Sequence, residues 1–251
     1  MNKILVTNNE ISVIDGNVRI EGKKIYFKEN GDYEIEYNDC NDVELEFRID
    51  SGTMIKLFEY SDNDEIRVKN KYFLQEHSNL LVFKFYNNKK CREEIVFNLD
   101  GEYAKVNYHF SNICRDTEEY KIIINHNKLH TYSNISNRSI AIEGRTDFTI
   151  DSILPKKSIG CVLNQDTKII NLGENHSTIR PNMYIDLNDV EARHGSVVGT
   201  FKNDQVFYLM SKGISYNNAL KLLIKGYLLS KIEVSQDVRM RIMRIIDRYW
   251  R

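Results

Sequence analysis

The sequence predicts an all-β body followed by a short helical segment, and three observations support this. Runs in which apolar and charged residues alternate recur along the first 200 residues, as at residues 33–37 and 43–49. Glycines beside Asp, Asn or Glu separate many of these runs and are typical of turns. After residue 200, apolar residues recur at intervals of three and four. We therefore expect a β body at residues 1–200 and a helical segment at residues 201–251.

Two kinds of strand are expected in the β body. Residues 33–37 and 43–49 alternate so regularly that one face of each strand should be buried and the other solvated. Residues 80–86, 95–97 and 120–124 are denser in apolar side chains, which is typical of strands covered on both faces. No strict repeat of 20–50 residues is evident, so the pattern alone leaves a sandwich, a barrel or a β-helix open.

The C-terminal segment is expected to begin with two helices. Asn203-Asp204 offers a cap and a negative charge for a helix start, and Lys212-Gly213 offers a cation and a permissive residue for its end. Ser215 starts the second helix. The residues expected to share one face are Val206, Phe207 and Met210 in the first helix, and Ala219, Leu222, Leu223, Gly226 and Leu229 in the second.

A third helix is expected after Ser235, which is suited to cap it. Its apolar stripe comprises Val238, Ile242, Ile245, Ile246 and Tyr249, and its other positions include Arg239, Arg241, Arg244, Arg248 and Arg251. A basic amphipathic helix can bind membranes or acidic proteins. A stripe with a charged back is more often a helix packed on its own domain, and this is our prediction.

Composition excludes several classes of protein. The formal net charge of −1 provides no general field for nucleic acid or an acidic membrane, so neither is expected as a partner. The four cysteines are widely spread and form no CxxC pair, which argues against a zinc ribbon or a disulfide scaffold. The N-terminal stretch is too briefly apolar for a signal peptide, and no later run is long enough to span a membrane. A cytoplasmic protein is expected.

The search for catalytic motifs is negative. No phosphate-binding GxxxxGK[ST], GxSxG, HExxH or GxGxxG pattern is present, so the protein is not expected to be an enzyme. His126 and His130 would meet on a helix, but their surroundings indicate a strand, where residues four apart are about 13 Å apart. We expect no metal site there. Cys161 is most simply a small buried hydrophobe, and a role in sulfur handling is the weaker alternative.

A set of C-terminal motifs resembles a known family. The runs at residues 194–199 (HGSVVG), 207–215 (FYLMSKGIS) and 222–227 (LLIKGY), with Ala219 before the last, occur in one order without gaps. This order resembles the C-terminal signature of the SufB/SufD family of iron–sulfur cluster assembly proteins. Residues 130–131, 153–157 and 181–183 resemble weaker family positions. No resemblance is found before about residue 125.

The resemblance implies a fold and a type of subunit. Members of this family are built on a right-handed parallel β-helix closed by C-terminal helices, which selects among the three β architectures. The helical N-terminal region usual in the family is not seen, because strands are expected from about Ile11, so the chain resembles a compact member. His194 matches the histidine that opens the family's His-Gly or His-Glu motif, and Gly195 makes the motif SufD-like. Where SufB-like proteins carry a cysteine, this chain has Gln165.

His194 is therefore a candidate ligand for a cluster, since a neutral imidazole binds iron well. A role as a hydrogen-bonding residue that fixes the turn before Gly195 is equally open. No cluster is expected to be bound stably by the chain alone, whereas a transient iron–sulfur cluster in a complex is compatible with the resemblance.

The family's partners are implied in the same way. In the family the C-terminal helices bind an ABC-type ATPase, SufC, and the β-helix pairs with SufB or with another copy of itself. The residues expected to bind the ATPase are Gln205, Phe207, Tyr208, Lys212, Gly213, Leu222 and Gly226. Two alternatives remain: a homodimeric minimal scaffold that holds its own cluster, and a β-helix enzyme or carbohydrate-binding protein that shares only the fold.

Overall fold

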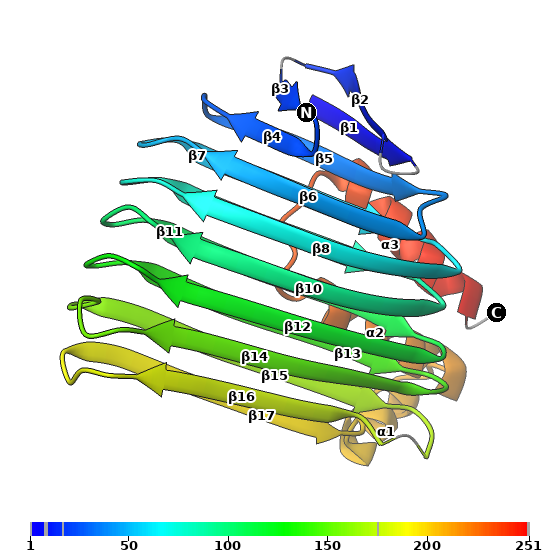
Figure 1. Cartoon of the computed structure of the whole chain (residues 1–251). Coiled ribbons are helices and arrows are strands. Elements are labelled where there is room, and N and C mark those ends of the chain that lie inside the picture. Colours follow the sequence, from blue (N-terminus) through cyan, green and yellow to red (C-terminus); the bar gives the residue numbers. More distant parts are fainter. Residues whose placement is uncertain (1, 8–9, 17, 175, 250–251) are drawn as a thin grey trace.

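The computed structural model describes residues 2–7, 10–16, 18–174 and 176–249. Within them the chain forms a parallel β-solenoid of about seven turns, followed by three helices (Figure 1). The strands are β1 (Asn2–Thr7), β2 (Glu10–Asp15), β3 (Arg19–Glu21), β4 (Lys24–Phe27), β5 (Gly31–Asn38), β6 (Asp42–Ile49), β7 (Met54–Ser61), β8 (Glu65–Leu74), β9 (Asn79–Tyr86), β10 (Lys90–Leu99), β11 (Lys105–Cys114), β12 (Thr117–His126), β13 (Tyr132–Ala141), β14 (Arg145–Leu154), β15 (Cys161–Asn171), β16 (Thr178–Ile185) and β17 (Val190–Gly199). The helices are α1 (Asn203–Ser211), α2 (Tyr216–Leu229) and α3 (Gln236–Tyr249).

The strands form two sheets that face each other across the solenoid. The order in sheet A is β17-β15-β13-β11-β9-β7-β5-β1-β2, and the order in sheet B is β16-β14-β12-β10-β8-β6-β4-β3. From β5 and β6 onward, each strand pairs in parallel with the strand two positions later in the chain. The predicted parallel β-helix with C-terminal helices is confirmed, and a sandwich of antiparallel sheets is excluded.

Unbroken register stacks equivalent side chains on top of one another inside the solenoid. Phe47, Tyr72 and Phe97 occupy one inward row of sheet B, and their ring centroids are 4.5 and 4.8 Å apart. Parallel strands lie about 4.8 Å apart, so identical ring orientations in successive coils are in van der Waals contact. The alternation in residues 43–49 thus places its apolar side chains in a continuous core.

One corner of the solenoid repeats a left-handed backbone position in successive coils. The residues with positive φ there are Gly52 (72°), His77 (56°), Tyr103 (58°), His130 (55°) and Gly160 (67°). Each of them donates its backbone N–H to a carbonyl of the next coil. The rings of His77, Tyr103 and His130 stack with centroids 4.9 and 5.0 Å apart. Glycine continues this column at residue 160, because a Cβ there would lie 2.4 Å from the His130 ring.

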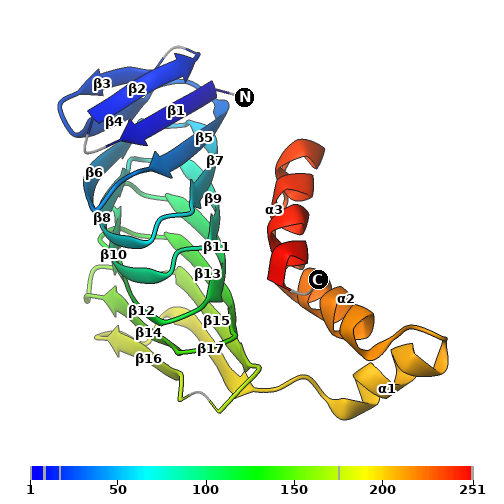
Figure 2. The same ribbon diagram turned by 90° about the vertical axis from the view of Figure 1, so that its right-hand side faces the viewer.

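The helices cover the outer face of sheet A (Figure 2). Ile242, Ile245 and Ile246 of α3 and Leu228 of α2 are buried in one cluster with outward side chains of sheet A such as Phe83. Arg241 of α3 also forms an ion pair with Glu34 of β5, 2.9 Å between Nη2 and Oε1. The prediction that the third helix packs on its own domain is therefore confirmed, although Arg251 lies outside the described residues.

The position of the helices explains which strands were predicted correctly. Residues 80–86 lie in β9 under the helices and are covered on both faces, as predicted. The same prediction is wrong for residues 95–97 and 120–124, because β10 and β12 belong to sheet B, whose outer face is not covered by any of the three described helices. Conversely, Glu34 was expected to be solvated, but Arg241 covers it and its exposure is 7%.

The helix boundaries agree with the predicted starts, but two details differ. Lys202 and Ser215 are the N-cap residues of α1 and α2, and neither makes a side-chain capping hydrogen bond. Ser235 does cap α3, since its Oγ accepts the backbone N–H of Val238 at 3.4 Å. Among the described residues, no helix is long and apolar enough to cross a membrane.

Candidate functional site

The C-terminal helices expose a set of apolar and aromatic side chains. All seven residues predicted to bind a partner are exposed: Gln205, Phe207, Tyr208, Lys212, Gly213, Leu222 and Gly226. Phe207 and Tyr208 are each 63% exposed, and Leu222 is 50% exposed. Large exposed apolar side chains on neighbouring helices are candidates for an interaction site. We call these seven residues the helical patch.

The buried faces of α1 and α2 differ from the predicted ones, and this difference leaves apolar residues of the helical patch exposed. Of the three residues expected to share a buried face in α1, only Val206 is buried. In α2 the buried residues are Ala219, Ile224, Leu228 and Leu229, so the stripe is rotated and Leu222 points to solvent. At the end of α1, the Lys212 ammonium lies 5.5 Å from the centroid of the Tyr208 ring, a distance at which the cation and the ring attract.

His194 lies on β17, the last strand of the solenoid. No residue of β17 is buried, because in the described part of the chain β17 pairs with β15 on one side and has no strand on the other. The register places His194 beside Gln165 on the inward face of sheet A. Because no further coil follows, this inward position is exposed. We call β16 and β17 together the open end of the solenoid (Figure 1).

Gly195, the residue after His194, lies close to the Asp166 side chain. A Cβ built at Gly195 would lie 3.8 Å from Oδ1 of Asp166. The Asp166 carboxylate is itself held by Arg138, which is 5% exposed, through a short contact from Nη2 to Oδ2. Lys168 lies near the same carboxylate, with 3.8 Å between its Nζ and the Asp166 Oδ1.

Cys161 and His126 are connected through Thr131 inside the solenoid, a link that the sequence did not suggest. The Cys161 Sγ is 3.1 Å from the Thr131 Oγ1, and that hydroxyl is 2.7 Å from the His126 Nδ1. The His126 Nε2 lies 2.9 Å from the Ser133 Oγ. Burial lowers the pKa of His126 to about 4, so the ring is neutral. Both side chains are fully buried, as predicted for Cys161.

His130 and His126 lie in different parts of the solenoid. The His130 ring stacks on Tyr103 at the corner, whereas the His126 side chain is buried in the interior. Within the part of the chain that the structure describes, no group of three or more His, Cys, Asp or Glu side chains is arranged to hold a metal.

A buried ion triad in the interior was missed by sequence reasoning. The Lys84 Nζ lies 2.6 Å from the Glu93 Oε1 and 3.2 Å from the Glu59 Oε2, and all three side chains are buried. Burial lowers the pKa of Lys84, but the two carboxylates outweigh it and leave that pKa raised. The available signal was the lysine at an inward position of the dense apolar run at residues 80–86, since a buried charge requires a partner.

A second buried acid lies further along the interior. Glu118 has no exposed surface, and its carboxylate accepts a short hydrogen bond from the Asn112 amide. Burial raises the pKa of Glu118 to about 8, so its carboxyl is mostly protonated at neutral pH. The interior therefore carries both ionised and neutral acids.

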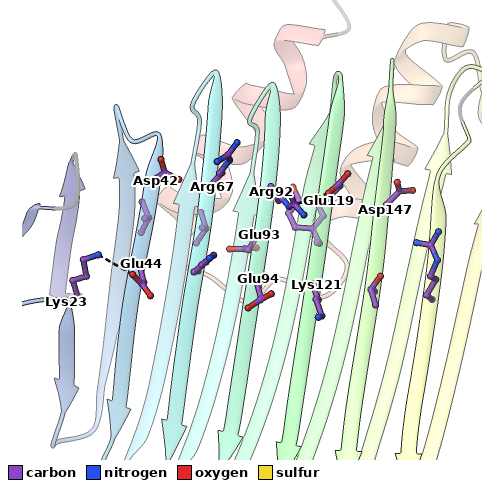
Figure 3. A pocket seen from close by; sticks show the side chains of 16 residues that line it. Lys23, Asp42, Glu44, Arg67, Arg92, Glu93, Glu94, Glu119, Lys121 and Asp147 are labelled. Atoms are coloured by element: carbon purple, nitrogen blue, oxygen red, sulfur yellow. Dashed lines mark hydrogen bonds and ion pairs between the residues drawn. The ribbon is translucent and has the colours of Figure 1, made fainter.

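The outer face of sheet B forms a shallow groove of about 900 Å³. Charged side chains rise from neighbouring strands along it (Figure 3). In one row Glu44, Lys69, Glu94 and Lys121 alternate in sign across the register. Opposite charges on adjacent strands stabilise the sheet itself, and the one aromatic residue of the lining, Tyr120, is buried. These features do not favour carbohydrate binding, which relies on exposed aromatic rings.

Comparison with known proteins connects this geometry to a family. Residues 43–227 match the model of the SufBD core domain of SUF system FeS cluster assembly. An iron–sulfur cluster assembly SufBD family protein of Mycobacterium leprae is 41% identical over 71 residues, which make up 27% of this chain and 18% of that protein. The iron–sulfur cluster assembly protein SufD of Escherichia coli is 24% identical over 132 residues, which make up 51% of this chain and 27% of that protein.

The matched segments thus span less than a third of the length of these two curated relatives. The family match, by contrast, covers most of this chain, including β6 through α2 and both the open end and the helical patch. The chain belongs to the SufB/SufD family of SUF iron–sulfur cluster assembly proteins.

Proposed function

We propose that this chain is a non-enzymatic, SufD-like subunit of an iron–sulfur cluster assembly complex. It pairs with a SufB-like protein, or with a second copy of itself, through the open end, and it binds a SufC-type ABC ATPase through the helical patch. The observation that carries the proposal is the open end, where the motif histidine lies on an uncovered strand within a family-matched solenoid.

The open end is suited to pairing for a physical reason. An edge strand presents unpaired backbone N–H and C=O groups, which another strand can complete. The open end adds exposed apolar side chains to this edge: Tyr184 (55%), Val197 (49%) and Val198 (43%). A partner solenoid that extends the sheet past β17 would satisfy the backbone and bury these side chains together.

In this arrangement His194 is one ligand of the iron–sulfur cluster, which is the cargo that the complex assembles. An imidazole is a suitable ligand for iron, and a single histidine needs further ligands from elsewhere. Gln165 stands where SufB-like proteins place a cysteine, so the thiolates come from the partner and the chain alone should hold little iron. The His194→Ala variant should lower the cluster content of the anaerobically co-expressed complex without changing the melting temperature of the chain.

The helical patch provides the second contact. Tyr208 and Phe207 are the kind of aromatic anchors that dominate binding energy when a partner desolvates them. Their helix is joined to the solenoid through α2, whose Tyr227 hydroxyl donates to the Lys168 carbonyl at 2.5 Å and whose Leu228 carbonyl accepts from the Ser111 hydroxyl at 2.8 Å. Movement of a bound ATPase would therefore be transmitted to sheet A.

A reciprocal pair of variants tests the two contacts. Tyr208→Ala should weaken binding of the ATPase by about 1–3 kcal/mol and leave pairing with the SufB-like protein unchanged. Tyr184→Ala, a matched change of an exposed tyrosine at the open end, should weaken pairing and leave ATPase binding unchanged. Affinities are measured by calorimetry with the purified partners. Equal binding of the ATPase by wild type and Tyr208→Ala would refute the placement on the helical patch.

A further inference from the structure

Gln165 has one half of its amide fixed and the other half unpartnered. Its Nε2 donates to the Ser152 Oγ at 2.8 Å and to the Asn182 backbone carbonyl at 3.3 Å. A backbone carbonyl can only accept, so the nitrogen and oxygen of the amide are assigned without ambiguity. The residue is 3% exposed, and its Oε1 atom is buried and has no hydrogen-bond partner among the described residues.

The register leaves one side chain in the same inward row that can serve this oxygen. On the side facing the solenoid interior, the neighbour of Gln165 is Ile135, which has no donor. On the side facing the open end, the neighbour is His194. Paired residues on adjacent parallel strands lie about 4.8 Å apart with their side chains on the same face. The His194 side chain is exposed, so its ring can turn toward Gln165 without displacing packed groups.

We propose that the His194 ring donates its N–H to the Gln165 Oε1, and that Gln165 is thereby a positioning residue for His194. This inference rests on the proposed role of His194 as an iron ligand. A neutral imidazole has one protonated and one free nitrogen, and the hydrogen bond made by the first decides where the second points. With its N–H directed into the solenoid, the free nitrogen of His194 faces the open end, where the cluster and the partner's thiolates would be.

The hydrogen bond also gives Gln165 a role that a thiol at this position would not have. Oε1 is a buried acceptor, and such groups are rarely left unpaired. Nε2 is anchored on β14 and β16, so the acceptor is held by the opposite sheet and cannot follow the ring when it moves. A ligand on an exposed edge strand would otherwise sample several ring orientations. Fixing the ring removes that freedom before the cluster arrives.

Two substitutions separate the acceptor from the rest of the side chain. Gln165→Leu and Gln165→Glu both remove the amide N–H groups, but only the glutamate keeps an acceptor. The ring ¹⁵N shifts of His194 in the full chain report its tautomer, with the His194→Ala spectrum used for assignment. Wild type and Gln165→Glu should show one dominant tautomer, and Gln165→Leu should show a mixture. Gln75→Leu, at an exposed glutamine directly after β8 and outside both proposed binding surfaces, is the control for a change of glutamine that leaves the tautomer unchanged.

The second readout is cluster content in the complex co-expressed with the SufB-like partner and the ATPase. Removing a hydrogen bond behind a ligand lowers metal affinity by about tenfold or more, so Gln165→Leu should load less iron and sulfide than Gln165→Glu. An unchanged His194 tautomer in a folded Gln165→Leu chain would overturn the inference, because the ring would then keep its tautomer without the acceptor of Gln165. A tautomer that changes as expected, with full loading of the His194→Ala complex, would instead refute the proposed function and leave the hydrogen bond standing.

Discussion

The two ends of the solenoid are finished in different ways. At the N-terminal end the chain turns back in two antiparallel pairs, β1 with β2 and β3 with β4. Ile4 and Val6 are fully buried there, and Ile11 packs against the same core. At the other end β17 has no buried residue, and nothing in the described chain covers its outer edge.

This contrast separates what stabilises the protein from what it offers to a partner. An antiparallel hairpin changes the direction of the chain, so it closes the stack of parallel coils and covers the core with its own apolar side chains. The open end keeps the parallel direction, and its backbone is ready for another parallel or antiparallel strand. Changes near the closed end and in the interior should therefore affect unfolding, whereas changes at the open end should affect association.

The largest expected effect on stability comes from the buried ion triad. Lys84→Ala leaves Glu59 and Glu93 buried without their cation, which should lower the free energy of unfolding by about 3–5 kcal/mol. Lys168→Ala, at a lysine 43% exposed on β15 below the open end, should change it by less than about 0.5 kcal/mol. Urea unfolding of both variants checks this.

A neutral version of the triad provides the control. Replacing Glu59 and Glu93 with Gln and Lys84 with Met in one chain removes the charges together, and such replacements are often neutral or stabilising. If Lys84→Ala lowered the free energy of unfolding as little as Lys168→Ala, the two buried carboxylates would not depend on Lys84 to compensate their charge.

The next effect concerns the pH dependence of unfolding. Burial raises the pKa of Glu118 to about 8, whereas the unfolded carboxyl ionises near its ordinary value of about 4.3. Between these values the folded state binds a proton that the unfolded state releases, so stability is fully present below the unfolded pKa and decreases as pH rises toward 8. From pH 5.5 to pH 8 the loss should be on the order of 3 kcal/mol.

Glu118→Gln removes this titration and keeps a polar group beside Asn112. The variant should be more stable than wild type at pH 8, and the difference should shrink toward pH 5. Guanidinium unfolding at several pH values measures it. A difference that is independent of pH would mean that Glu118 is ionised in the folded protein.

The architecture could be predicted from the sequence only with the help of the family resemblance. Alternation located the strands and a change of spacing located the helices, but neither specifies which strand pairs with which. The structural repeat is present at the corner residues 52, 77, 103, 130 and 160, and their identities are Gly, His, Tyr, His and Gly. A repeat defined by backbone conformation rather than by residue type escapes a search for similar residues.

The candidate site was predictable in part, again through the family resemblance. His194 and the helical patch lie in runs with a recognisable order, so these residues could be named from the sequence. Their exposure could not be predicted from it. The buried stripe of α2 was misplaced because Leu222 and Ile224 are equally apolar, and only packing on sheet A decides between them. Gln165 acquires its meaning from register, which places it beside residues 30 and 29 positions away. Lys84 and Glu118 acquire theirs from the two facing sheets, which bring each of them against a residue nine or six positions away on the opposite sheet.

A matched pair of valines compares the two ends directly. Val6 on β1 has no exposed surface, and Val6→Ala should lower the free energy of unfolding by about 1–3 kcal/mol, through lost burial and the cavity that remains. Val198 on β17 is 43% exposed, and Val198→Ala should cost less than about 0.5 kcal/mol. Thermal and urea unfolding of the chain without partners measures both. Equal costs would contradict the view that only one end is closed by its own core.

The smallest effect on stability is expected from adding a charge to each outer edge. Ile14 on β2 is 59% exposed and Val197 on β17 is 49% exposed, so Ile14→Lys and Val197→Lys should each change the free energy of unfolding by less than about 0.5 kcal/mol.

Their effects on association should nevertheless differ, because a lysine on an edge strand discourages pairing with another strand. Val197→Lys should weaken binding to the SufB-like partner, or self-association, at least tenfold, whereas Ile14→Lys should leave it unchanged. Sedimentation velocity over a range of concentrations distinguishes the two variants. If Ile14→Lys weakened assembly as strongly as Val197→Lys, the outer edge of β2 would be a second binding edge. The antiparallel hairpin would then cover the core at that end without preventing a partner from binding there.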